Sequence, residues 1–79
     1  MNKEKYIKIF AEVFEVPANS VENLEYQSIP EWDSVGHMTL MGELEEAFDI
    51  TIDMEDIIDF SSFAKGIELL SKYGIEIDR

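Results

Sequence analysis

The chain has 79 residues and no cysteine, so it can form one small domain but neither disulfides nor thiolate metal sites. Any thiol chemistry must then come from an attached group. Eighteen acidic residues against six basic ones give a formal net charge of −12, which makes nucleic acids and anionic membranes poor partners. The charge favours protein partners with basic surfaces, and it equally suits a small domain that has only to stay soluble.

The first predicted element is an amphipathic helix over about residues 2–14. Its apolar side chains recur at helical spacing, and lysines and a glutamate occupy the other face. Residues 15–32 show no period, so we predict a long first loop with room for a short turn of helix near residues 18–22. A connection of this length needs attachment to the core. The isolated apolar residues that can provide it are Val16, Val21, Leu24, Tyr26, Ile29 and Trp32.

A second helix is predicted over about residues 34–48. Asp33 precedes it and suits the N-cap position, because its carboxylate can accept the free amide hydrogens of the first turn. The side chains predicted to face the core from this helix are Met38, Met41, Leu44 and Phe48, with Leu40 beside them.

Two shorter elements follow. Residues 49–52 alternate in the manner of a strand, but a single strand would have no pairing partner. We therefore predict a connector that buries Ile50 and Ile52. A short helix over about residues 54–59 comes next and carries two adjacent isoleucines.

The last predicted helix is capped by Ser61 or Ser62 and ends at Gly74. Its inward-facing side chains are predicted to be Phe63, Ile67 and Leu70. Gly66 inside this helix costs about 1 kcal/mol relative to alanine, and close approach of a neighbouring side chain would explain its presence.

These elements predict an all-α fold: a small bundle of three main helices and one short helix, with a long first loop. We expect residues 1–79 to form a single domain. No apolar stripe is left over once the three helices pack, so we expect a monomer. The chain has no long apolar run and no leader-like start, which favours a cytoplasmic protein without membrane insertion.

The segment 31–52 carries a resemblance to a known family. Asp33 and Ser34 open a helix with apolar positions along it, and Leu-Glu-Glu-Ala-Phe at residues 44–48 leads into an alternating apolar tail. In a chain of this size and acidity, this pattern resembles the acyl carrier proteins, which are phosphopantetheine-binding carriers. The resemblance extends over essentially the whole chain.

The resemblance implies a function. In the family, a phosphopantetheinyl transferase moves 4′-phosphopantetheine from coenzyme A to the serine that matches Ser34, and Asp33 serves as cap and recognition residue. The arm then holds an acyl or aminoacyl intermediate as a thioester. A phosphodiester at a helix N-terminus meets free amide hydrogens and the positive end of the helix dipole. Such a carrier catalyses nothing itself, because the chemistry belongs to the cofactor and the partner enzymes.

Some positions depart from the main fatty-acid carriers. Trp32 stands where a small residue is common, and Gly36 and Thr39 replace acids. The sequence looks more like a stand-alone carrier of a specialised pathway. The residues expected to contact partner enzymes with basic docking surfaces are Val35, His37, Met38, Glu43, Glu45, Glu46, Asp53, Glu55 and Asp56.

Catalytic and metal-binding interpretations are less favoured. Asp33, Ser34 and His37 contain the residue types of a hydrolytic triad, but one helix start cannot supply the second wall of such a site. We therefore expect His37 at the surface, as a partner-contacting residue. The acids of residues 53–59 lack the pattern of a calcium-binding loop, so we expect no metal site.

A second hypothesis from a different class stays open. An acidic interaction module or inhibitor without a prosthetic group would explain the charge of −12 equally well. It would not explain why Asp33 and Ser34 open the second helix with the family pattern after them. Ser34→Ala separates the two hypotheses, since it removes carrier activity and leaves a charge-driven binder unaffected.

Overall fold

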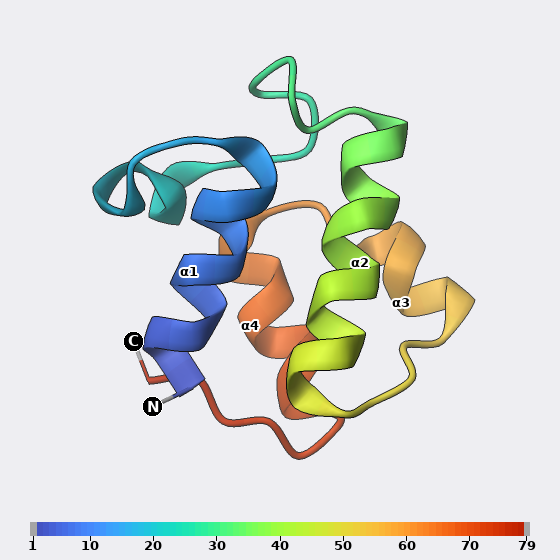
Figure 1. Ribbon diagram of the computed structural model, residues 1–79. Coiled ribbons are helices and arrows are strands. Elements are labelled where there is room, and N and C mark those ends of the chain that lie inside the picture. The colour runs from blue at the N-terminus through green and yellow to red at the C-terminus, as the bar shows by residue number, and fades with distance from the viewer. Residues whose placement is uncertain (1, 79) are drawn as a thin grey trace.

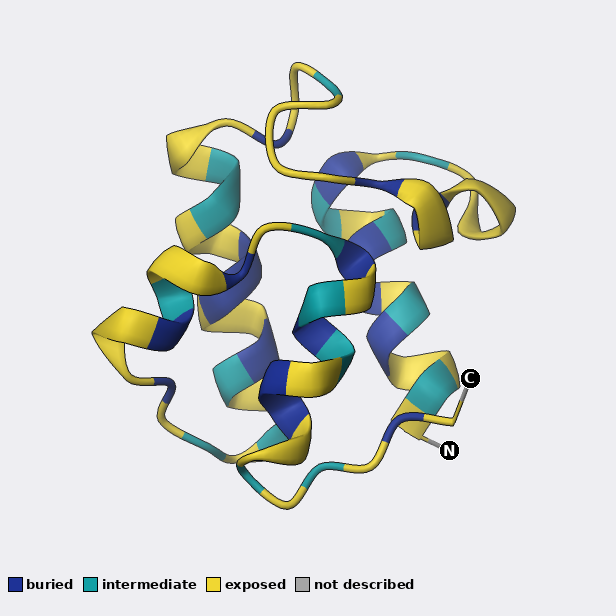
Figure 2. Cartoon of the chain, turned by 180° about the vertical axis from the view of Figure 1, so that it is seen from behind, coloured by how far each residue is buried: buried dark blue, intermediate teal, exposed yellow. Residues whose placement is uncertain are grey.

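The computed structural model describes residues 2–78, which form helices joined by irregular segments (Figure 1). In chain order the elements are α1 (Asn2–Phe14), the 3₁₀ helix η1 (Ala18–Asn23), α2 (Ser34–Phe48), α3 (Met54–Asp59) and α4 (Phe63–Ser71). Sheet-type pairing in this range is limited to one isolated bridge between Glu25 and Ser62. The predicted all-α fold, with three main helices, one short helix and a long first loop, is confirmed. The buried residues of α1, α2 and α4 face a shared core (Figure 2).

Three aromatic side chains spaced four residues apart form the buried face of α1. Tyr6, Phe10 and Phe14 are completely buried, and burial of one large apolar side chain contributes about 1.5–3 kcal/mol to stability. The Tyr6 hydroxyl donates a hydrogen bond of 2.7 Å to the Phe63 carbonyl, so its polar end is satisfied inside the core. Burial raises the pKa of Tyr6, which keeps the hydroxyl protonated as a donor.

The long first loop is attached to the core by buried side chains, as predicted. Val21, Leu24 and Trp32 are all buried, and Trp32 is 0 % exposed. The Trp32 ring stacks on Phe14 with 5.0 Å between centroids and meets Phe10 edge-on at 5.5 Å. Aromatic pairs of this kind add about 0.5–1.5 kcal/mol beyond their buried area. Because Trp32 lies one residue before the cap of α2, its burial fixes where that helix begins.

The start and end of α2 agree with the prediction. Asp33 caps the helix, because its Oδ1 accepts a 2.8 Å hydrogen bond from the Gly36 amide. After Phe48 the chain leaves the helix through Asp49, whose φ of 55° is left-handed. Aspartate tolerates this conformation better than most residues other than glycine.

The prediction that Met38 faces the core is wrong. Met38 is 54 % exposed, and the half-buried His37 takes the first position of the inward face. The fully inward side chains that follow are Leu40, Met41 and Leu44, with Ala47 and Phe48 partly buried beside them. Residues three and four positions before Met41 both lie near its face of the helix, so spacing alone does not decide between Met38 and His37.

The connector and α3 carry little apolar burial. Residues 49–52 form no strand, and Ile52 is buried while Ile50 is half-buried, as expected for the predicted connector. In α3, Ile57 is half-buried and Ile58 is 74 % exposed. A six-residue helix with so little apolar contact needs polar contacts to hold its position.

The last helix begins at one of the two predicted caps. Ser62 accepts a 2.9 Å hydrogen bond from the Lys65 amide, so Ser62 rather than Ser61 is the cap. The buried apolar side chains of α4 are Phe63, Leu69 and Leu70. Ile67, predicted to face inward, is only half-buried. The chain turns after the helix at Gly74, whose φ of 81° favours glycine.

Two core side chains cross α4 at Gly66. A Cβ added there would lie 2.2 Å from Cζ of Phe60 and 2.2 Å from the hydroxyl of Tyr6. The expected close approach at this glycine is therefore confirmed. Gly42 in α2 is the opposite case, because it is exposed and an added Cβ would meet no atom within 4 Å apart from its chain neighbours and the backbone of its own helix.

We predict opposite effects for alanine at these two glycines. Gly66→Ala should lower the free energy of unfolding by about 1–3 kcal/mol, because Phe60 and Tyr6 must move aside. Gly42→Ala should raise it by about 0.5–1 kcal/mol through helix propensity alone. Urea unfolding followed by Trp32 fluorescence measures both values. Stabilisation by both substitutions would contradict the packing described for α4.

Candidate functional site

Ser34 is the first residue of α2, and its side chain is exposed. Asp33 occupies two of the first-turn amides: its carboxylate accepts from Gly36 and its carbonyl accepts from His37, both at 2.8 Å. The amides of Ser34 and Val35 lie in the first turn of α2, where no carbonyl of the helix is placed to accept their hydrogens. Together with the helix dipole, these amides place partial positive charge beside the Ser34 hydroxyl.

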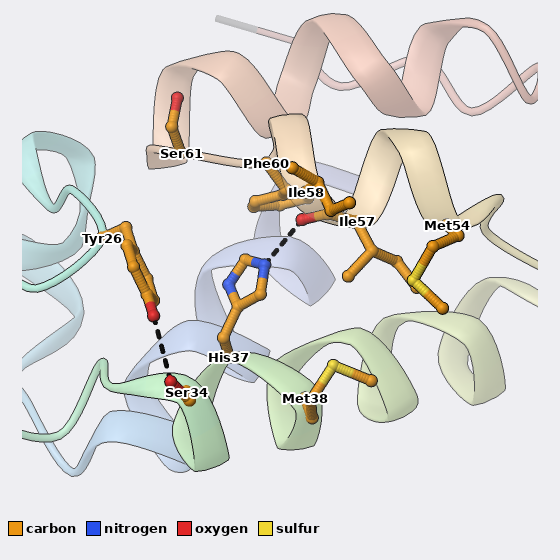
Figure 3. A pocket seen from close by; sticks show the side chains of 9 residues that line it. All are labelled: Tyr26, Ser34, His37, Met38, Met54, Ile57, Ile58, Phe60 and Ser61. Atoms are coloured by element: carbon orange, nitrogen blue, oxygen red, sulfur yellow. Dashed lines mark hydrogen bonds between the residues drawn. The ribbon is translucent and has the colours of Figure 1, made fainter.

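Two hydrogen bonds hold the ring of His37. The Trp32 Nε1–H donates to Nδ1 of His37 at 2.9 Å, and an indole can only donate, so Nδ1 is the acceptor. With Nδ1 as acceptor, the ring has its proton on Nε2, which donates to the carbonyl of Ile57 at 2.7 Å (Figure 3). The imidazole thus connects the first loop, α2 and α3. The ring is half-buried and both nitrogens are engaged within the chain, and the expected contact of His37 with partners stays a prediction.

An apolar groove opens beside Ser34, between the first loop, α2 and α3 (Figure 3). It is lined by Tyr26, Ser34, His37, Met38, Met54, Ile57, Ile58, Phe60 and Ser61. Its volume of about 360 Å³ lies within the range of about 300–1,000 Å³ that is usual for small-molecule sites. The Tyr26 hydroxyl lies 3.3 Å from Oγ of Ser34, on the loop side of the groove.

Comparison with known families places this geometry in context. The family model described as a phosphopantetheine attachment site matches residues 7–70, which include η1, α2 and α3 and most of α1 and α4. The chain belongs to this family. The resemblance read from the sequence is thereby confirmed, and 4′-phosphopantetheine is the prosthetic group of such a domain. No curated protein and no solved structure matches the chain.

The residues around Ser34 fit a phosphopantetheine group. The serine hydroxyl is exposed and can be reached by a transferase. The helix start next to it favours a phosphate. The groove gives the apolar parts of an attached arm a surface to lie against, since most of its lining consists of methionine, isoleucine and phenylalanine side chains.

The structure separates the expected partner-contacting residues of this carrier domain into two groups. The exposed ones are Val35, Met38, Glu43, Glu46, Asp53 and Glu55, and their contact with partners stays a prediction. Three others are engaged within the chain. His37 is held as described, and Oε2 of Glu45 accepts a 2.8 Å hydrogen bond from the Ile52 amide. Asp56 is only 5 % exposed, which leaves little of its side chain for a partner to contact.

Sequence reasoning missed most of the groove. Tyr26 appeared only as a residue attaching the loop to the core, and Met54, Phe60 and Ser61 were not connected with Ser34. One signal was present: Ile57 and Ile58 are neighbours in a short helix, and neighbours about 100° apart around the helix axis cannot both face one core. One of the two therefore had to contribute to an apolar surface.

The part of the chain that the structure describes contains no group of three or more metal-ligating side chains. Within residues 2–78, none of the helices has both the length and the apolar composition needed to span a lipid bilayer.

A polar cluster holds α3 against the end of α4. Lys72 Nζ lies 2.7 Å from Oδ1 of Asp56, and the Tyr73 hydroxyl donates to Oδ2 at 2.5 Å. The same Tyr73 oxygen accepts from the Asp53 amide at 2.9 Å. Hydrogen bonds from Lys72 and Tyr73 hold the pKa of Asp56 below its usual value. The carboxylate therefore stays charged at mildly acidic pH and keeps its two donors.

We predict that Asp56→Asn destabilises the protein in a pH-dependent way. A carboxylate with a lowered pKa in the folded state stabilises the fold above its unfolded pKa of about 4, and this contribution is lost as pH falls through the folded value. The substitution should lower the free energy of unfolding at pH 7, and the gap to wild type should close as pH falls below about 4. Urea unfolding at a series of pH values measures the gap. A difference in unfolding free energy between wild type and Asp56→Asn that stayed constant down to pH 2.5 would refute the link between Asp56 ionisation and stability.

Proposed function

We propose that this protein is an acyl or aminoacyl carrier whose Ser34 holds the 4′-phosphopantetheine arm. The observation that carries the proposal is the position of the Ser34 hydroxyl: exposed, at the first residue of α2, and at the edge of an apolar groove. Membership of the phosphopantetheine attachment family supports it, since Ser34 lies within the matched residues. Asp33 serves as helix cap and as a recognition contact for the transferase.

Ser34 is the nucleophile in the loading step. Its Oγ forms a bond to the pantetheine-bearing phosphorus of coenzyme A, the bond to the adenosine 3′,5′-bisphosphate group breaks, and the serine proton passes to a base of the phosphopantetheinyl transferase. The amides of Ser34 and Val35 would favour the single negative charge of the resulting phosphodiester. When bound, the arm supplies a thiol that holds the cargo as a thioester. The protein contributes position and presentation, and the reactions of the cargo take place on partner enzymes.

The apolar lining of the groove favours an apolar or short cargo over a large polar one. Met38 on α2 and Ile58 on α3 offer flexible or aliphatic surface at the opening, and both are exposed. Methionine side chains adapt readily to ligands of different shape. The arm and the first atoms of an acyl or aminoacyl group can lie along this surface between visits to partner enzymes.

Partner recognition in this proposal combines apolar and acidic contacts. Val35 and Met38 are exposed next to Ser34, and acids flank them along α2 and at the start of α3. The accessible acids are Glu43, Glu46, Asp53 and Glu55. A transferase or loading enzyme with a basic docking surface would be attracted at long range and released quickly, as a carrier requires. We expect the protein to act as a cytoplasmic monomer.

Intact-protein mass spectrometry tests the attachment. Purified protein is incubated with coenzyme A and a broad-specificity phosphopantetheinyl transferase, alongside Ser34→Ala and the matched control Ser61→Ala, which removes the other serine at the groove. We predict one phosphopantetheine adduct on wild type and on the Ser61 variant, and none on the Ser34 variant. Since Ser34 is exposed, its replacement should leave the urea midpoint nearly unchanged.

The opposite result would favour the other class of protein. A folded wild type that accepts no adduct from several transferases would contradict the carrier proposal. It would make an acidic interaction module or inhibitor the better explanation of the net charge of −12.

A further inference from the structure

The backbone around Tyr26 is fixed from two directions. The Tyr26 amide donates to the Ser61 carbonyl at 2.8 Å, and the bridge between Glu25 and Ser62 lies beside this bond. The next amide, that of Gln27, donates to the Trp32 carbonyl at 2.9 Å. The loop is thus joined to the α3–α4 connection and to the residue before the α2 cap. A side chain on this backbone has a defined starting point relative to Ser34.

The ring of Tyr26 is also held. It meets the His37 ring at 66° with 5.3 Å between centroids and the Trp32 ring at 84° with 6.5 Å. Both are edge-on arrangements of the kind that aromatic rings prefer. Trp32 and His37 are themselves linked by a hydrogen bond, so the phenol rests on a rigid support. From this support the Tyr26 hydroxyl points at Ser34 and lies 3.3 Å from its Oγ (Figure 3).

The chemistry of this contact changes when Ser34 is modified. Before modification, either hydroxyl can donate to the other. Afterwards Oγ is an ester oxygen without a proton, so only Tyr26 can donate. The charged oxygens of a phosphodiester would lie two bonds beyond Oγ, on the phosphorus, within reach of a hydroxyl placed here. Hydrogen bonds to such charged acceptors are shorter and roughly twice as strong as neutral ones.

Other polar groups at the groove are less suited to this task. Besides Ser34 and Tyr26, the polar side chains that line it belong to His37 and Ser61. Both ring nitrogens of His37 are already engaged within the chain. Asp33, next to Ser34, carries a negative charge that repels a phosphate, although its Oδ1 is partly occupied by the Gly36 amide. The Tyr26 hydroxyl, a neutral donor on the loop side of the groove, therefore complements the amides at the start of α2 as a partner for the phosphate.

We propose that Tyr26 is a positioning residue that donates its hydroxyl to the phosphodiester on Ser34 and holds the base of the arm beside the groove. This inference rests on the proposed function. It gives the long first loop a task beyond covering the core, because the loop carries a phenol that reaches the attachment point. The contact restricts rotation about the first bonds of the arm and favours arm conformations that run along Met38 and Ile58.

Phosphorus NMR of the loaded protein tests the proposal. The samples are wild type, Tyr26→Phe, and Met54→Leu as a control that alters the groove lining away from Ser34. Urea-unfolded loaded protein supplies the reference shift of a free diester. We expect the Tyr26→Phe resonance to move from the wild-type position toward that reference and to narrow, and the Met54→Leu resonance to stay at the wild-type position. The phenylalanine ring preserves the contacts with Trp32 and His37, and the Trp32 indole proton signal verifies the fold.

A second substitution makes the sign of the effect testable. Site-specific 3-fluorotyrosine at position 26 keeps the ring size and makes the hydroxyl a stronger donor, so the phosphorus resonance should move away from the unfolded reference. A resonance that is the same in wild type and Tyr26→Phe, or that moves as far in Met54→Leu, overturns the proposal. Intact mass distinguishes a failure of the proposed function from a failure of the Tyr26 proposal. No adduct on wild type overturns the proposed function. A normal adduct together with a phosphorus resonance that does not move in Tyr26→Phe overturns only the role of Tyr26.

Discussion

The hydrogen bond from the Trp32 indole to the His37 imidazole is the interaction on which the site depends. Trp32 is completely buried against Phe10 and Phe14, and it lies two residues before Ser34. A buried indole N–H without an acceptor would cost about 1–3 kcal/mol, so the acceptor has to come with the fold. His37 supplies it from the first turn of α2. Burial of one aromatic ring therefore sets both the start of the helix and the exposure of the serine that opens it.

The same imidazole also fixes the position of α3 on the other side of the groove. Its second nitrogen donates to the Ile57 carbonyl, and α3 has few apolar contacts of its own. At its other side α3 is held by the buried Asp56 with Lys72 and Tyr73. The wall of the groove is thus positioned by polar contacts, while its lining stays apolar. This division suits a carrier, because a wall held by a few hydrogen bonds can shift when cargo or a partner enzyme binds.

Much of the fold could be predicted from the sequence because its local signals agree with one another. Asp33 before an apolar helical pattern marks the start of α2, and Gly74 marks the turn after α4. Gly66 indicated a close approach. Glycine inside a helix costs stability relative to alanine, so its presence there suggests that a neighbouring side chain needs the space. The family pattern at Asp33 and Ser34 depends on adjacent residues, so it too can be read without the fold.

The contacts between distant segments could not be predicted. Whether His37 or Met38 faces inward depends on the buried indole of Trp32, which periodicity does not record. Asp56 looked like one more surface acid, and its burial depends on Tyr73, seventeen residues further along the chain. The approach of Tyr26 to Ser34 requires the loop to be joined to residues 61 and 62. In each case the decisive partner lies on another element.

Nitrogen NMR of the imidazole tests the central claim most directly, since the chain has one histidine and one tryptophan and both signals are unambiguous. We predict a His37 ring with its proton on Nε2 and an unprotonated Nδ1 that accepts from the indole. The Trp32 Nε1–H should then exchange slowly with solvent, because it is buried and bonded. A ring with its proton on Nδ1, or an indole proton that exchanges as fast as in the unfolded chain, would contradict the account.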